Sequence, residues 1–199
     1  MIPSIPDSPT AKAAADLAAE AEPAFLLNHS WRTYLFGRLL TGKLEVDEEA
    51  AFVAAMLHDV GLTETHRGER EFAGVGADVA CRFLEARGWD RDRIHLIEQA
   101  IIRHTNLVAE EEPVSRVVQA GAAVDVVGFG YEEVGPDDLA GILAAYPRLD
   151  FVAAMPRLFL AEARRHPEGA FADLERVVSA SDRMRVNPID LIAGGVETG

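Results

Sequence analysis

Apolar residues recur at helical spacing through most of this sequence of 199 residues, and the alternation typical of strands is scarce. Start and stop signals bound these stretches, because Asp47 and Asp90 are placed as N-caps and Gly42 and Gly88 as helix ends. The pattern predicts an all-α fold. We expect helices at residues 11–21, 25–41, 47–58, 72–87, 90–104, 113–127 and 136–146, then at 150–166 with a bend or break at Pro156, and at 171–180.

The length and the 49% share of hydrophobic residues suit one globular domain with a sizeable core. We expect residues 1–22 to form a tail and a first helix, and residues 23–199 to form a single helical domain. The single cysteine, Cys81, allows no internal disulfide, and neither a signal peptide nor a membrane span is recognisable. We therefore expect a cytoplasmic protein.

The charge balance narrows the classes of partner. Aspartate and glutamate outnumber lysine and arginine by 33 to 19, and no basic run is present. Nucleic acid and anionic membranes would be repelled on average, so we expect neither as a partner. A small-molecule substrate is the expected partner, and self-association into a homo-oligomer stays open.

Several polar residues fall on apolar helix faces. In AFVAAMLHDVGL a helical apolar pattern ends on His58 and Asp59, where neither belongs unless something satisfies it. Asp125 lies on the apolar face of its predicted helix, and His29 and His104 lie on the inner faces of theirs. A lone inward histidine is usually a hydrogen-bonded core residue, but two histidines and two aspartates on three helices satisfy one another best around a divalent cation. The predicted ligands are His29, His58, Asp59 and Asp125 around one metal ion, zinc first, with iron or manganese as alternatives.

This residue set resembles the HD-domain superfamily of metal-dependent hydrolases, named for an adjacent His-Asp pair. The resemblance covers roughly residues 25–130 and implies a helical bundle with a metal site between its central helices. Within it, NHS at 28–30, AMLHDVG at 55–61 and AIIRH at 100–104 resemble the mononuclear group that includes the cyanamide hydratases. Dinuclear relatives carry a histidine four residues before a GA pair, where this sequence has Phe72, which favours a single metal ion.

Addition of water also requires a group that moves a proton. Zinc lowers the pKa of bound water to about 7, which supplies the nucleophile, and a nearby histidine is the natural proton carrier. We predict His104 in that role, with Glu64 and Glu71 as acidic alternatives. The competing hypothesis is that His104 only orients a ligand by hydrogen bonding.

Three further residues near these motifs are predicted to bind substrate, namely Asn28, Arg32 and Thr105. For Arg32 the alternative is an ordinary surface arginine, and for Asn28 it is a helix cap or a supporting position.

The resemblance favours an enzyme that adds water to a small, largely uncharged molecule, with conversion of cyanamide to urea as the family's example. The alternative is a phosphohydrolase acting on a nucleotide or phosphate ester, which would need several cationic side chains around the metal. The sequence offers only Arg32, Arg67, Arg70 and Arg103 near the predicted ligands, which favours the uncharged substrate. A third hypothesis is a catalytically silent metal-bearing module that binds a partner.

Overall fold

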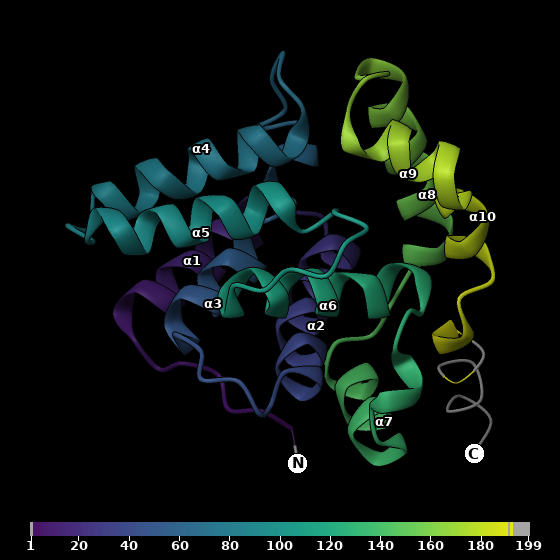
Figure 1. Ribbon diagram of the computed structural model, residues 1–199, viewed down its shortest axis with the longest axis horizontal. Helices are drawn as coiled ribbons and strands as arrows, with labels where there is room; N and C mark the ends of the chain where they lie inside the picture. Colours follow the sequence, from purple (N-terminus) through teal and green to yellow (C-terminus); the bar gives the residue numbers. More distant parts are fainter. Residues whose placement is uncertain (1, 191, 193–199) are drawn as a thin grey trace.

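The computed structural model describes residues 2–190 and 192, and within these residues the protein is all-α, as the sequence predicts (Figure 1). The described elements are α1 (Pro9–Ala21), α2 (Ala24–Leu40), α3 (Glu48–Leu57), η1 (Val60–Leu62), α4 (Phe72–Glu85), α5 (Arg91–Arg103), α6 (Pro113–Val127), η2 (Tyr131–Glu133), α7 (Pro136–Ala145), α8 (Phe151–Arg165), α9 (Ala170–Val178) and α10 (Ala180–Arg185).

Caps supplied by the local sequence account for three of the helix boundaries. Asp47 accepts a hydrogen bond from the Ala50 amide at the start of α3, and Asp90 accepts one from the Asp92 amide at the start of α5. Gly128 ends α6 in the left-handed conformation at φ 72°. Local sequence chemistry is therefore sufficient to place these ends.

The last helices differ from the prediction in two respects. Of the bend or break expected at Pro156, the break does not occur, because α8 runs without interruption to Arg165. Since Pro156 lies in the second turn, it removes only the bond to the carbonyl of Val152, and its ring is buried. The expected helix over residues 171–180 instead ends at Val178, and α10 starts at Ala180, because Ser179 adopts a left-handed conformation at φ 49° and redirects the chain.

The core surrounds α3, in which every residue from Ala50 to Leu57 is buried. Helix α1 contributes Ala11, Ala14 and Ala18 to the same hydrophobic cluster, so the predicted first helix packs into the main core. A second apolar cluster joins the ends of α2 and α4 to α8, α9 and α10, which form a separate group at one side of the molecule (Figure 1). None of the helices in the described part of the chain combines the length and hydropathy of a membrane span.

Helices α2 and α6 approach each other at backbone contact through two glycines. A Cβ atom on Gly37 would lie 2.1 Å from the carbonyl oxygen of Val117, and one on Gly121 would lie 1.8 Å from that of Thr33. The helices are antiparallel, so one turn beyond the Thr33–Gly121 contact His29 faces Asp125. This contact sets the distance between two predicted site residues.

Replacement of Gly121 by alanine tests this contact. We expect Gly121→Ala to lower the free energy of unfolding by about 1–3 kcal/mol or more, because a rigid backbone oxygen leaves no room for the methyl group. Gly42→Ala is the matched control, since its Cβ would meet its nearest atom at 3.5 Å. Urea denaturation measures both, and equal stabilities of the two variants would contradict the close approach.

Candidate metal centre

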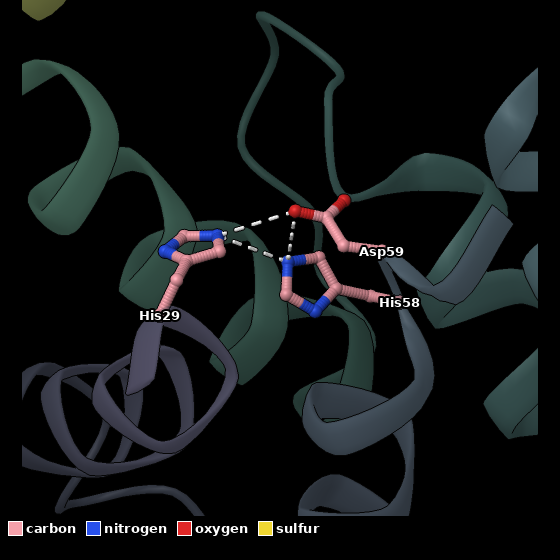
Figure 2. Close-up of side chains that lie close together, drawn as sticks. All are labelled: His29, His58 and Asp59. Atoms are coloured by element: carbon pink, nitrogen blue, oxygen red, sulfur yellow. Dashed lines mark hydrogen bonds and ion pairs between the residues drawn. The ribbon is translucent and has the colours of Figure 1, made fainter. Parts of the chain in front are cut away.

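His29, His58 and Asp59 meet between α2 and the end of α3 (Figure 2). The Nε2 atoms of the two histidines are 3.2 Å apart, and Asp59 Oδ2 lies 3.5 Å from His29 Nε2 and 3.4 Å from His58 Nε2. All three side chains are buried. Atoms about 2.1 Å from a tetrahedral zinc ion lie about 3.4 Å from one another, so the three atoms have the spacing of metal ligands.

The hydrogen bonds of the histidines fix which ring nitrogen faces the centre. His58 donates from Nδ1 to the Ala55 carbonyl at 2.7 Å, and His29 donates from Nδ1 to Asp125 at 2.7 Å. In a neutral imidazole protonated at Nδ1, Nε2 carries only a lone pair. Metal-binding histidines show the same arrangement, with the second ring nitrogen donated to an oxygen.

His104 repeats this geometry at the end of α5. It donates from Nδ1 to the Ile101 carbonyl at 2.6 Å, and its Nε2 lies 3.8 Å from Asp59 Oδ1. The His104 and His58 rings pack edge to face with centroids 4.8 Å apart. Three imidazole nitrogens thus face one carboxylate.

This arrangement is electrostatically incomplete without a cation. Both oxygens of Asp59 are buried and have no hydrogen-bond partner. Burial raises the pKa of Asp59, and burial together with the neighbouring His29 lowers the pKa of His58 to about 3. Burial and the neighbouring His58 lower the pKa of His104 to about 4, so the ring is neutral at pH 7. A divalent cation would satisfy all of these acceptors at once.

Asp125 was predicted as a ligand, but the structure places it on the opposite side of the His29 ring from the centre. Its Oδ1 accepts from Arg32 Nε and Arg148 Nη1, both at 2.7 Å, and its Oδ2 accepts from Arg32 Nη2 at 2.8 Å. Burial alone would raise its pKa, but the charges of Arg32 and then Arg148 outweigh burial and hold the pKa of Asp125 well below its usual range. In this structure Asp125 contacts His29 and the two arginines, and it is not among the three residues whose ligand atoms lie together at the centre.

Sequence reasoning missed the residues that hold Asp125. Arg148 lies in the connection before α8, and Asn187 lies near the C-terminus, from where its Nδ2 donates to the Asp125 carbonyl at 2.9 Å. Arg148 also pairs with Asp190. Neither position lies on a helical apolar face, so the sequence pattern carried no signal for them.

Two predicted substrate-binding residues are used within the protein. Arg32 is fully buried, which also excludes the surface alternative, and its remaining nitrogen donates to the carbonyls of Tyr146 and Pro147. Asn28 donates to the Pro147 carbonyl at 2.7 Å. Both therefore fix the connection that carries Arg148, and the guanidinium of Arg32 has no nitrogen left for an anion.

The two acidic alternatives lie elsewhere. Glu71 accepts from the Ala170 amide at 2.6 Å and so caps α9. Glu64 is exposed and lines a separate pocket beside the buried carboxylate of Glu22. No sequence pattern pointed to Glu22, whose pKa is raised well above its usual value by burial and by the charge of Asp59, while Ser30 donates to it at 3.1 Å.

A cavity of about 580 Å³ opens onto the centre. His29, Asp59, His104 and Thr105 line it, and the buried hydroxyl of Thr105 has no hydrogen-bond partner within the protein. Of the residues predicted to bind substrate, Thr105 is therefore the one that the structure places beside both the centre and an open space.

The chain is similar to proteins of known family. A family model described as "HD domain" matches residues 26–184. Two proteins of Saccharomyces cerevisiae, named Cyanamide hydratase DDI2 and Cyanamide hydratase DDI3, are each 25% identical over 178 residues, which cover 85% of this chain and 79% of each relative. Ribonuclease Y of Thermosipho melanesiensis is 27% identical over 128 residues, which cover 64% of this chain but 23% of that protein.

The neutral state of His104 predicts a pH dependence. Folding lowers the pKa of His104 from 6.5 to about 4. Between these pH values the unfolded chain therefore binds more protons than the folded one, and the contribution of the neutral His104 to the free energy of unfolding is lost as the pH falls. In metal-free protein the stability advantage of the wild type over His104→Leu should shrink by up to about 1.4 kcal/mol per pH unit between pH 6.5 and 5. Taking this difference cancels contributions common to both proteins, including that of Glu22. Urea denaturation at several pH values measures it, and a difference independent of pH would refute the prediction.

The Asp125 cluster predicts a large loss of stability on truncation. Asp125→Ala leaves Arg32 and Arg148 buried without their shared partner and should cost about 3–5 kcal/mol in unfolding free energy, measured with chelator present. Asp78→Ala, which removes an exposed partner of Arg70, is the control and should cost less than about 1 kcal/mol. Similar losses for both variants would show that the buried cluster has no special role.

Proposed function

This chain belongs to the HD-domain family, and we propose that it is a metal-dependent enzyme that adds water to an uncharged substrate, with cyanamide as the reference compound. The membership confirms the resemblance seen in the sequence, since the family model covers most of the chain. The observation that carries the proposal is the convergence of three imidazole Nε2 atoms on the unpartnered carboxylate of Asp59 at one end of a cavity. The two yeast relatives named as cyanamide hydratases support the choice of reference substrate.

We assign the metal ligands to His29, His58, Asp59 and His104. The first three have the spacing that zinc requires, and His104 shares the hydrogen-bonding pattern of His58, because each donates Nδ1 to the carbonyl three residues earlier. This assignment replaces Asp125 by His104, which sequence reasoning had given a role in proton transfer. Nitrogen and carboxylate donors suit zinc, iron or manganese, and we propose zinc.

One ion is proposed because an apolar residue occupies the place of a further ligand. The Phe72 ring packs edge-on against His104, with centroids 5.6 Å apart, and also contacts the Phe171 ring. Phe72 offers no lone pair to a second ion. Its ring instead packs against the His104 imidazole, which restricts how that ring can turn.

Asp125 and Thr105 have different roles in the proposed hydration. A bound divalent cation would polarise the substrate and lower the pKa of water. Asp125 holds the His29 ring by its Nδ1 proton, and the Thr105 hydroxyl, buried beside the cavity, has no other hydrogen-bond partner in the described part of the chain.

The four arginines predicted near the ligands are not among the residues that line the cavity. Arg32 is used by Asp125, the exposed Arg70 pairs with Asp78, and Arg103 lies 3.6 Å from Glu110. Two other arginines, Arg116 and Arg183, do line the cavity, so an anionic substrate has to be tested beside an uncharged one. The similarity to ribonuclease Y keeps phosphate release as the measured alternative.

Elemental analysis followed by two assays tests the proposal. We expect about one zinc ion per purified chain, urea from cyanamide, and no phosphate from a panel of nucleotides. Two metal ions per chain with phosphate released would refute it and favour a phosphohydrolase. One metal ion with neither product would favour a silent module.

The ligand assignment predicts different outcomes for neighbouring residues. Asp59→Ala and His104→Ala should each lose the metal on dialysis, because each removes a donor atom. Asp125→Asn should still bind zinc, with affinity lowered about 10–100-fold, because only the orientation of His29 is weakened. Zinc titration against a chelator measures these affinities, with the exposed His95→Ala as control.

Retention of full zinc affinity by His104→Ala together with loss of turnover would contradict the ligand role. It would return His104 to the proton-transfer role that the sequence suggested.

A further inference from the structure

The cavity at the metal centre is lined mostly by apolar side chains. Away from the candidate ligands, residues of α6 line it together with residues of α8, α9 and α10. The apolar members include Ala123, Val126, Met155, Phe159, Leu174 and Val178. The pairs from α6, α8 and α9 are three or four residues apart, so each pair lies on one face of its helix.

The volume exceeds what cyanamide needs. A water molecule takes about 30 Å³ of the liquid, and cyanamide is only slightly larger, whereas the cavity measures about 580 Å³. Cavities of about 300–1,000 Å³ are typical of sites for drug-sized ligands. A cyanamide molecule at the centre would leave most of the apolar wall in contact with water, which is unfavourable.

Polar side chains beyond the centre include Asn106, which donates to Glu110, and Arg116. Gln119 uses its side chain within the protein, accepting from the Glu110 amide and donating to the carbonyls of Asn106 and Val108. Glu133 and Arg183 line the cavity but are exposed, so they stand toward solvent, as do the exposed apolar side chains of Leu107 and Phe129. The way in from solvent is therefore partly apolar as well.

We propose that the substrate carries an apolar body, an alkyl chain or ring, that fills the space between α6 and α8–α10 while its uncharged polar end reaches Thr105 and the metal centre. The inference rests on the proposed function and narrows its substrate to an organic nitrile with such a body. Water adds across the carbon–nitrogen triple bond: the oxygen bonds to carbon, both hydrogens end on nitrogen, and the amide is the only product. The test also distinguishes this substrate from two other occupants of the cavity, a peptide and a second copy of the chain.

Binding is tested first with the full-length, zinc-loaded protein and N-phenyl-1-naphthylamine, an uncharged probe that fluoresces in apolar surroundings. We expect saturable binding of one probe per chain, displaced by phenylacetonitrile. Val178→Trp and Ala123→Phe, which fill the cavity from α9 and α6, should each weaken binding about tenfold or more, equivalent to ~1.4 kcal/mol.

Val177→Trp is the matched control, because Val177 is the exposed neighbour of Val178 and does not line the cavity. It should bind the probe as the wild type does. Circular dichroism and zinc content should be unchanged in all three variants. If Val178→Trp fails to fold, the probe affinity of Ala123→Phe alone decides the test.

Turnover separates this inference from the proposed function. We expect kcat/KM for amide formation to rise from cyanamide and acetonitrile to hexanenitrile and phenylacetonitrile, and to fall in Val178→Trp for the larger compounds only. Cavity-dependent probe binding without turnover of any nitrile or cyanamide would support the apolar pocket and refute the proposed function.

Turnover of cyanamide without probe binding, or with binding that both cavity variants leave unchanged, would overturn the inference and leave the proposed function standing. Loss of probe binding on self-association, seen by light scattering, would also overturn it, because a second copy would then occupy the space.

Discussion

Two buried aspartates lie on opposite sides of the His29 ring, and the site is arranged by how each carboxylate is neutralised. Asp125 receives its positive charge from the protein itself, through Arg32 and Arg148. Asp59 has no arginine or lysine partner in the described part of the chain, and the Nε2 atoms of His29 and His58 face it. A buried carboxylate with two arginine partners is already neutralised, whereas one without such partners is well satisfied by a bound cation.

This division depends on the close packing of α2 and α6. Because Gly37 and Gly121 allow backbone contact, the next turn of each helix brings His29 within hydrogen-bond distance of Asp125. Helix α3, which is apolar and buried from Ala50 to Leu57, then brings His58 and Asp59 to the same point, and α5 brings His104. Four helices thus converge on one small volume, and none of their side chains can move far without opening the core.

The chain uses its C-terminal third for two separate purposes. Arg148, in the connection before α8, and Asn187, after α10, donate hydrogen bonds to Asp125. Helices α8, α9 and α10 supply residues that line the cavity. This part of the chain therefore influences both how the centre is held and which molecules reach it. Relatives with a similar metal centre could differ in substrate through this part of the fold, because binding specificity follows the shape and polarity of the pocket.

The sequence by itself determined the helices and the inward direction of His29, His58, Asp59 and His104, because caps and apolar periodicity are local properties of the chain. It did not determine the partner of each polar atom. Asp125 became a support for His29 because Arg148, far along the chain, reaches it, and Glu71 became the cap of α9 because that helix starts beside it. Periodicity tells which residues point into the core, but which nitrogen faces which oxygen depends on helix packing and on connections, and these only the tertiary structure decided.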